Sequence, residues 1–354
     1  MPDDYRKIAI VGAGSVGASA AYALVISGLV SEIVLVDINR YRAEGEAMDL
    51  AHGAAFTKPI NIHVGNYKDC LDADIIIFAA GANQKPGETR LDLVHKNIQV
   101  LRDTLPEIID PKGDTILLMV SNPVDVLTYA ALRFSGLPPE RVLGSGTVLD
   151  SSRFRHLISE HCKVEPRNIH AYVIGEHGDS EVLLWSRASI AGLSVGEFCR
   201  LRNIPCPDQD DITCKVRNAA YEVIHRKGAT YYAIGLAVRR VCESILRDEN
   251  SILTVSGLID GIYGITDICF SLPSVVNRSG RVAVLPVPLD DVEKRALQKS
   301  AAVLQQTQSE IQWEPSPHGL HYFAGAWPEN SGHYKYDHYL SQLRSPEANT
   351  NRPF

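Results

Sequence analysis

His177 is the residue whose surroundings most favour acid–base chemistry in this chain. It lies between Gly175 and Gly178, which let the backbone turn tightly and leave the imidazole uncrowded. Imidazole titrates near neutral pH, so it can both donate and accept a proton there. Glu176 and Asp179 flank it. Three interpretations therefore stay open from these residues: a catalytic histidine, a structural one, and a fragment of a metal site.

A second set of polar residues opens a predicted helix at residue 147. Asp150 and Arg153 are three residues apart and share one helical face. Arg155 is two residues further on and points about 200° away from Arg153. A guanidinium can hold a carboxylate through two hydrogen bonds, although Asp-x-x-Arg is also the pattern of an ordinary surface ion pair. One helix could thus serve two sites.

The elements that must position these residues begin with a glycine-rich turn. An apolar strand is predicted over residues 6–11, followed by Gly12, Gly14 and Gly17 and by an alanine-rich helix over 18–26. Gly12 permits the tight turn, Gly14 lets the backbone approach a pyrophosphate, and Gly17 allows close helix–strand packing. The helix N-terminus then faces the phosphates.

A second strand, over residues 32–37, ends in Asp37, which follows Gly17 by 20 residues. A carboxylate there can accept hydrogen bonds from a ribose diol and repels a 2′-phosphate. The combination of strand, glycines, helix, strand and acid predicts a site for NAD rather than NADP. A glycine-rich turn in an unrelated α/β protein is the alternative.

Two more buried strands, over 74–81 and 115–122, predict a parallel, doubly wound sheet. Ligands of such sheets bind at the carboxyl ends of the strands, which places Gly81, Ser121 and Asn122 at the ligand edge. Residues 82–90 form a polar loop before a helix predicted over 91–101. That loop is a candidate lid or an ordinary solvated loop.

The second half mixes helices with antiparallel strands, as in an α+β domain. We expect strands over 168–175, 252–256, 265–273 and 281–287, and helices over 211–227, continuing to about 248, and over 290–308. The predicted domains are 1–146 for the dinucleotide and 147–313 for the substrate, with the helix near 230–248 packing back on the first domain. An extension, 314–354, follows.

Composition excludes several classes of protein. The chain has 35 basic and 42 acidic residues, a net charge of −7, which argues against a nucleic-acid partner. No apolar run reaches the ~18 residues of a membrane span, and the N-terminus lacks a signal-peptide pattern, so we expect a cytoplasmic protein. The seven cysteines show no metal-binding spacing and are interpreted as reduced thiols; no metal is expected.

Taken together, these segments closely resemble the lactate/malate dehydrogenase family over about residues 6–310, and most of all its bacterial members that act on lactate. The matching stretches are GAGSVG, VLVDIN, AMDLAHG, GANQKPGETRLDLVHKN, SNPVD, GSGTVLDSSRFR, IGEHGDSEV and KGATYYAIG. The resemblance implies an NAD-dependent oxidoreductase of glycolysis and fermentation that interconverts pyruvate and L-lactate.

The resemblance also implies roles for individual residues. His177 would be the proton donor and acceptor, oriented by Asp150; Arg153 would hold the substrate carboxylate, and Arg90 would polarise the carbonyl. The substrate site would contain Gln84, Arg90, Asn122, Asp150, Arg153 and Thr230. The NAD site would contain Gly12, Gly14, Val16, Gly17, Asp37, Arg42, Tyr67, Gly81, Ala82, Val120, Ser121, Asn122, Ser145 and Ile234.

Gln84 sets the expected substrate. Malate enzymes of the family carry arginine at this loop position, to pair with a second carboxylate, whereas a neutral glutamine suits the methyl group of pyruvate. An unpaired buried carboxylate is costly, so oxaloacetate should be strongly disfavoured. The rival functions are a malate-type or longer-chain 2-hydroxy-acid dehydrogenase, and a dinucleotide-binding scaffold without turnover.

Arg155 and His170 match the pair that binds fructose 1,6-bisphosphate between subunits in activated bacterial members. The resemblance therefore implies an allosteric homotetramer with that activator; the alternative is that both are polar interface residues. The departure from the family is the extension after Gln312, which holds His318, His321, His333 and His338 at irregular spacings. We expect it to be mostly disordered, with metal binding and partner docking as the alternatives, and a chain truncated after Gln312 to stay active.

Overall fold

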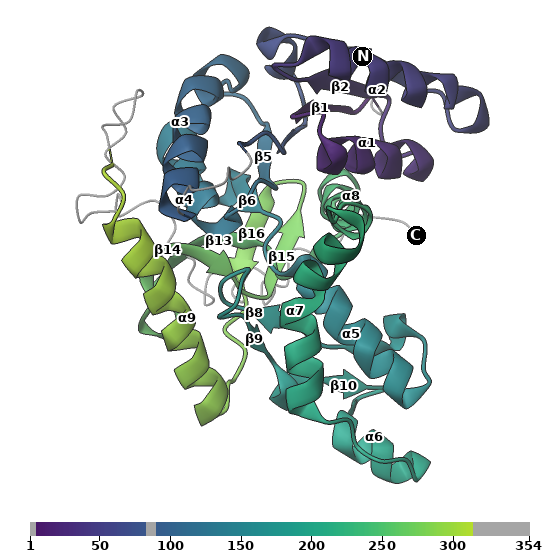
Figure 1. Cartoon of the computed structure of the whole chain (residues 1–354), viewed down its shortest axis with the longest axis vertical. Helices are drawn as coiled ribbons and strands as arrows, with labels where there is room; N and C mark the ends of the chain where they lie inside the picture. The colour runs from purple at the N-terminus through teal and green to yellow at the C-terminus, as the bar shows by residue number, and fades with distance from the viewer. Residues whose placement is uncertain (1–4, 83–89, 314–354) are drawn as a thin grey trace, which may run out of the picture.

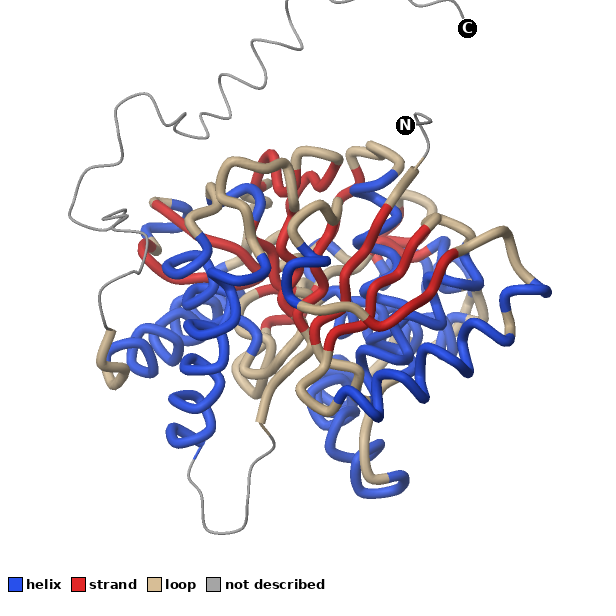
Figure 2. Tube along the Cα trace, turned by 90° about the horizontal axis from the view of Figure 1, so that it is seen from above, coloured by secondary structure: helices blue, strands red, loops and turns tan. Residues whose placement is uncertain are grey.

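The computed structural model describes residues 5–82 and 90–313, apart from the Arg90 side chain. Gln84 and the extension 314–354 therefore lie outside the described residues. Figures 1 and 2 show a central sheet with helices packed against it. The expected fold class is confirmed: a doubly wound parallel sheet is followed by an α+β part.

The sheet has eight strands among the described residues, in the order β14-β13-β6-β5-β4-β1-β2-β3. Six of them are parallel, and β13 and β14 continue the sheet antiparallel beyond β6, the outermost of the parallel strands. Residues of the second half of the chain thus complete the sheet of the first. The strands are β1 Lys7–Val11, β2 Glu32–Val36, β3 Asn61–Val64, β4 Ile75–Phe78, β5 Ile116–Met119, β6 Val142–Gly144, β13 Ser256–Asp260 and β14 Thr266–Ser271.

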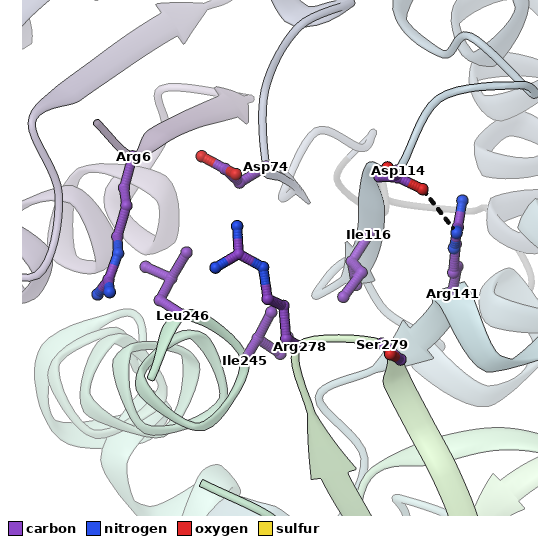
Figure 3. A pocket seen from close by; sticks show the side chains of 9 residues that line it. All are labelled: Arg6, Asp74, Asp114, Ile116, Arg141, Ile245, Leu246, Arg278 and Ser279. Carbon is purple, nitrogen blue, oxygen red and sulfur yellow. Dashed lines mark hydrogen bonds and ion pairs between the residues drawn. The ribbon is translucent and has the colours of Figure 1, made fainter. Parts of the chain in front are cut away.

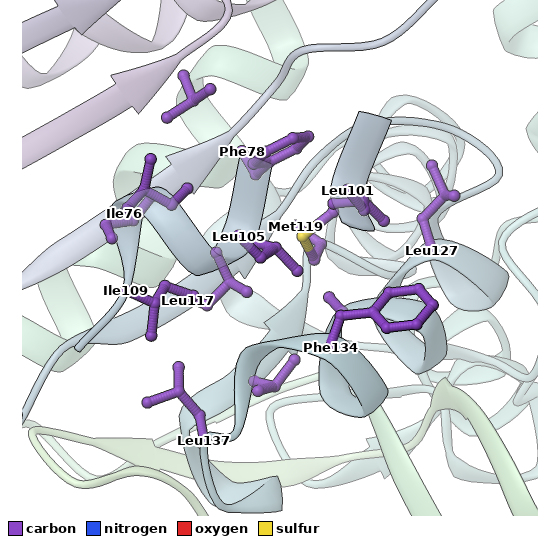
Figure 4. Close-up of a cluster of buried hydrophobic side chains, with 14 of the residues drawn as sticks. Ile76, Phe78, Leu101, Leu105, Ile109, Leu117, Met119, Leu127, Phe134 and Leu137 are labelled. Atoms are coloured by element: carbon purple, nitrogen blue, oxygen red, sulfur yellow. The ribbon is translucent and has the colours of Figure 1, made fainter. Parts of the chain in front are cut away.

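Both faces of the parallel sheet are covered by helices, which explains why its strands are continuously apolar. Successive side chains point to opposite faces: Ile8 and Ile10 pack with one helix layer, and Ala9 and Val11 with the other. The first layer holds α1 Ser15–Ser27 and α8 Tyr232–Leu246. The second holds α3 Arg90–Ile108 and α4 Val124–Ser135, whose packing Figure 4 shows.

Of the remaining helices and strands, α2 belongs to the first half of the chain, together with the 3₁₀ turns η1 and η2, and the others belong to the second half. The helices are α2 Arg40–His52, α5 Val148–Cys162, α6 Val195–Arg202, α7 Gln209–Lys227 and α9 Asp291–Ser309, with short 3₁₀ turns at η1 Ala54–Phe56 and η2 Tyr67–Cys70. The strands are β7 Ile169–His170, β8 Val173–Ile174, β9 Val182–Leu183, β10 Ser189–Ile190, β11 Leu193–Ser194, β12 Ser251–Leu253, β15 Ser274–Asn277 and β16 Gly280–Val284.

Four expected elements differ from the structure. The strand expected over 252–256 covers the end of β12 and the start of β13, with a break between them. The helix expected from 211 to 248 is two helices, because Gly228 adopts a left-handed conformation (φ 84°) and ends α7. The strand expected over 168–175 is two short strands, β7 and β8. The helix expected over 91–101 continues to Ile108 because Leu101, Leu105 and Ile108 form one buried stripe along it.

No helix in the described part of the chain is long and apolar enough to cross a membrane.

Candidate active site

The carboxyl ends of β1, β4 and β5 meet at one edge of the sheet, and the start of α5 and the loop after β8 supply the other groups of the site. Asp150 and Arg153 lie in the first two turns of α5. His177 follows β8, where Gly175 has a positive φ of 89° and pairs with Ser271 of β14. The second half of the chain therefore anchors the histidine on the sheet.

Asp150 joins His177 to Arg153. Its Oδ2 lies 2.6 Å from His177 Nδ1, and its Oδ1 lies 2.7 Å from Arg153 Nη1. The Asp150 side chain is 2% exposed and that of His177 is 24% exposed. The Asp150–Arg153 pair is thus a buried ion pair and not a surface one. With Nδ1 donating to Asp150, Nε2 of His177 is left without a hydrogen-bond partner among the described residues.

The charges in this cluster favour a protonated imidazole. Burial lowers the pKa of His177, but the carboxylate of Asp150 outweighs it and raises that pKa to about 9. Burial raises the pKa of Asp150, but His177 and Arg153 together hold it below the ordinary value. At neutral pH the pair is therefore an imidazolium beside a carboxylate, and it can give a proton to an acceptor at Nε2.

The carboxylates adjacent to His177 in sequence have other partners. Glu176 accepts a hydrogen bond from the Ser180 hydroxyl, and Asp179 accepts one from the Tyr221 hydroxyl at 3.0 Å. These contacts draw both carboxylates away from a shared ligand set with His177. The metal-site interpretation of this stretch consequently has no support from the described geometry.

Asp125, on α4, is a residue of the site that the sequence did not single out, although it belongs to the matched SNPVD stretch. It is buried and accepts the His177 backbone N–H at 2.7 Å and the Ser256 hydroxyl at 2.6 Å. Burial raises the pKa of Asp125 to about 6. These two hydrogen bonds connect the loop that carries His177 to α4 and β13. They thereby hold the loop in position above the sheet.

The glycine turn has the shape that a dinucleotide needs. Gly12 has a positive φ of 103°, and a Cβ at Gly17 would lie 1.9 Å from the Gly12 carbonyl oxygen. A Cβ at Gly14, by contrast, would meet nothing within 4 Å. The turn is therefore packed on its inner side and open at Gly14 beside the N-terminus of α1, where a pyrophosphate would approach.

Asp37 directly follows the last residue of β2, and its carboxylate organises the turn. Its Oδ2 accepts the Ala13 N–H at 2.7 Å and its Oδ1 accepts the Asn39 N–H at 2.8 Å. A carboxylate has about four acceptor positions, so capacity remains for a ribose diol. These residues fit NAD.

The other residues expected at the cofactor site fall into groups. Val16, Val120 and Ile234 pack in or against the same apolar cluster, at the first turn of α1, the end of β5 and the start of α8. Ser121 donates from its hydroxyl to the Ala80 carbonyl at 2.5 Å, and Ser145 is buried beside the end of β5. Arg42 on α2 and Tyr67 in η2 are exposed, with no described contact to the others.

Asn97 is a second residue that the sequence did not single out, although it lies in the matched stretch that begins with GANQKPG. From α3, its Oδ1 accepts the Ala82 N–H at 2.8 Å and its Nδ2 donates to the Asn122 carbonyl at 3.1 Å. It thereby fixes the ends of β4 and β5, including Gly81, at the expected ligand edge. An amide on an otherwise apolar helical face, between Val94 and Leu101, was the only available signal.

The remaining expected residues are less constrained. Thr230 is half-buried in the loop between α7 and α8, where no described contact joins it to His177. Arg155 donates to the Ala171 carbonyl at 2.9 Å and stacks over the Tyr172 ring, so it lies beside the strand that carries the exposed His170. Gln84 and the Arg90 side chain lie outside the described residues.

A separate hollow of about 310 Å³ lies at the opposite, amino-terminal edge of the sheet (Figure 3). Arg6, Asp74 and Arg278 line it, among others. Its position across the sheet separates it from His177, and we assign it no part in the reaction.

Comparison with known proteins agrees with this geometry. The NAD-binding domain of lactate/malate dehydrogenase matches residues 6–144, and the α/β C-terminal domain of the same family matches residues 147–313. The L-lactate dehydrogenase of Moorella thermoacetica is 54% identical over 303 residues, 85% of this chain and 96% of the relative. L-lactate dehydrogenase 1 of Clostridium acetobutylicum is 53% identical over 307 residues, which cover 86% of this chain and 98% of the relative.

The solved structures give the same result. The minor L-lactate dehydrogenase of Enterococcus mundtii, in its ligand-bound form, is 40% identical, with a TM-score of 0.83 over 88% of this chain and all of that one. The expected cofactor, NAD, is confirmed by the matching NAD-binding domain. With both domains matched in order along one chain, this protein belongs to the lactate/malate dehydrogenase family.

Proposed function

We propose that this chain is an NAD-dependent L-lactate dehydrogenase in which His177 transfers the proton that accompanies hydride transfer. The activity is the one for which the curated relatives at 53–54% identity are named. The observation that supports the assignment of His177 is the Arg153–Asp150–His177 chain of contacts at the ligand edge of the sheet. Bound NADH supplies the hydride to the keto carbon of pyruvate.

His177 gives its Nε2 proton to the carbonyl oxygen of pyruvate, which becomes the hydroxyl of L-lactate. Asp150 stabilises the imidazolium before this step and fixes the tautomer in which Nδ1 bears the other proton. In the reverse direction neutral His177 accepts the hydroxyl proton. His177 and Asp150 therefore act in both directions of the reaction, and the transferred proton is bound at His177 Nε2 each time.

Arg153 holds the substrate carboxylate. One of its nitrogens, Nη1, is engaged by Asp150, and the rest of the fork remains for a carboxylate beside His177. Arg90 polarises the carbonyl of pyruvate, and Gln84 and Thr230 shape the substrate pocket. The roles proposed for these three residues depend on the sequence match to the lactate/malate dehydrogenase family. Asn122 lines the same edge at the end of β5.

The decisive experiment follows NADH absorbance with pyruvate and then with oxaloacetate. We expect turnover with pyruvate and a much lower kcat/KM with oxaloacetate. Gln84→Arg should shift the preference toward oxaloacetate, because it supplies the cation that a second carboxylate needs. Absence of turnover with either substrate would favour a binding scaffold, and a Gln84→Arg variant that still strongly preferred pyruvate would contradict the role of Gln84.

We further propose that the chain assembles as a homotetramer activated by fructose 1,6-bisphosphate through Arg155 and His170. An apolar surface supports assembly: Ile26 and Phe56 are 62% and 91% exposed and line a hollow of about 340 Å³ with Tyr22 and Leu50. Exposed apolar surface of this kind is typical of contacts between chains.

Light scattering after size-exclusion chromatography tests the assembly. Phe56→Asp should reduce the oligomer size, whereas Leu201→Asp, at an exposed leucine on α6, should not. A titration of fructose 1,6-bisphosphate should lower the KM for pyruvate. If neither KM nor oligomer size responded, the effector assignment of Arg155 and His170 would be abandoned.

For the domains, we propose the division expected from sequence, 1–146 for NAD and 147–313 for the substrate, with 314–354 as an extension. A chain of 1–146 alone would lack β13, which pairs with β6. The proposed division therefore describes ligand binding and not independent folding. The cytoplasmic location stays a prediction.

A further inference from the structure

Glu181 is a buried acid whose carboxyl group is not fully hydrogen-bonded. Its side chain is 2% exposed, and its Oε1 has no hydrogen-bond partner in the part of the chain that the structure describes. It lies just before β9, four residues after His177, in a turn closed by its own N–H on the Gly178 carbonyl at 3.1 Å. A buried carboxylate oxygen without a partner is costly when it is ionised.

The other described acids around His177 are satisfied. Asp150 pairs with His177 and Arg153, Asp125 accepts a backbone N–H and a hydroxyl, and Glu176 accepts the Ser180 hydroxyl. Glu181 thus differs from its neighbours in hydrogen bonding and not in burial alone.

Charged groups from three elements interact electrostatically with the Glu181 carboxyl. Asp150 and Arg153 come from α5, His177 from the loop after β8, and Arg217 from α7. Arg217 donates to the main-chain oxygen of Glu181 at 2.7 Å, which holds the residue in place. The acid therefore lies beside the cations that our proposed function assigns to the substrate.

These surroundings keep the acid neutral at physiological pH. Burial raises the pKa of Glu181, Asp150 raises it further, and the three cations oppose both, so that it reaches about 8. Because the folded-state pKa is raised, Glu181 is protonated at pH 7 and ionises as the pH rises through about 8.

We propose that Glu181 is a positioning residue for the substrate carboxylate: its neutral form lets Arg153 and His177 bind the anion, and its ionised form weakens that binding. This inference rests on the proposed function. An ionised Glu181 places a second negative charge near Arg153, where it competes with the substrate for the same cation. The neutral acid carries no negative charge and does not compete with the substrate for Arg153.

The test is the KM for pyruvate between pH 7 and pH 9 in the wild type and in Glu181→Gln. In the wild type KM should rise about 20-fold, about tenfold from the ionisation of Glu181 and about twofold from the loss of the His177 proton. In Glu181→Gln it should rise only about two- to threefold, the part due to His177 losing its own proton. At pH 7 kcat of the variant should stay within about threefold of the wild type.

Glu176→Gln is the matched control, since it removes a buried carboxylate of the same loop that is hydrogen-bonded; its KM should follow the wild-type pH dependence. Parallel KM curves for the wild type and Glu181→Gln would overturn the inference. A wild type without pyruvate turnover would instead overturn the proposed function, so the two failures are distinguishable.

Thermal unfolding provides a readout that does not depend on catalysis. The Tm of Glu181→Gln relative to the wild type should increase from pH 5 to pH 8, because the unfolded wild-type chain ionises Glu181 in this range and the folded one does not. Glu181→Met, which also lacks the titration, should show the same trend. A Tm difference independent of pH in both variants would contradict a neutral buried Glu181.

Discussion

Asp150 controls the proton affinity of His177, so its charge should set the pH range of pyruvate reduction. In the wild type the pKa of His177 is raised to about 9, so kcat for pyruvate reduction should fall only as the pH rises through that value. Asp150→Asn removes the anion but leaves the burial, which lowers the pKa of a histidine. The alkaline limb of kcat/KM should therefore move down toward or below pH ~6.5, the ordinary value.

The same substitution should lower kcat/KM for pyruvate at pH 7 by about 100-fold or more, the usual contribution of a positioned acid or base. Asp211→Asn is the control, since Asp211 pairs with Lys215 on the exposed face of α7. Steady-state rates between pH 5 and pH 10 measure both effects. An unchanged alkaline limb in Asp150→Asn would mean that another group donates the proton.

At the scale of single residues, the sequence predicted the residues whose positions accept only one or a few amino-acid types. Gly12, Asp37 and His177 each occupy the predicted position, because a positive φ, a strand-ending acid and a loop imidazole leave signals in their immediate neighbours. Asn97 and Glu181 left no such signal. Their roles arise from contacts with Asn122 and with the Asp150 cluster, which are distant in sequence and adjacent only after folding.

At the scale of elements, the glycine turn should allow NADH binding and stability to be changed separately. Gly14 has φ −73° and open space around its Cβ position, so Gly14→Ala should change the free energy of unfolding by less than about 0.5 kcal/mol. It should nevertheless raise the Kd for NADH at least about tenfold, because the methyl group occupies the side on which the pyrophosphate approaches. Titration calorimetry and chemical denaturation measure the two quantities.

Gly12→Ala should have its main effect on stability, unlike Gly14→Ala, whose main effect should be on NADH binding. Its φ is 103° and its Cβ would lie 2.5 Å from the Ala80 nitrogen, so folding should suffer first, by about 2 kcal/mol or more. Gly45→Ala on α2 is the control, because nothing lies within 4 Å of its Cβ position and NADH binding should not change. Tight NADH binding by Gly14→Ala would show that the cofactor does not approach this turn.

Element prediction succeeded where a local pattern was sufficient. Strands β1, β2, β4 and β5 are apolar on both faces, which only a covered parallel sheet allows. Strand β13 could not be assigned to the same sheet, because its pairing with β6 joins segments more than a hundred residues apart. The break at Gly228 was missed because the residues on both sides favour helix, and a glycine there ends α7 only through its backbone conformation.

At the scale of the whole molecule, Trp313, the last residue that the structure describes, packs against the core. Its ring lies 5.3 Å from that of Tyr129 in an edge-to-face arrangement, and Arg133 stacks over it at 5.1 Å. Its Nε1 donates to the Gln308 carbonyl at 3.1 Å. A truncation after Gln312, which the sequence suggested as harmless, therefore removes a packed aromatic side chain from the surface of α4.

Two truncations separate the extension from this contact. A chain of residues 1–313 should keep the wild-type kcat and Tm. A chain of residues 1–312 should keep its kcat but lose about 1–3 kcal/mol of stability, because a partly buried tryptophan contributes less than the 3–5 kcal/mol of a fully buried one. Calorimetry on both chains measures the difference, with Trp313→Ala in the full-length chain as the control. If 1–313 lost activity or precipitated while Trp313→Ala did not, residues 314–354 would have a role of their own in the folded molecule.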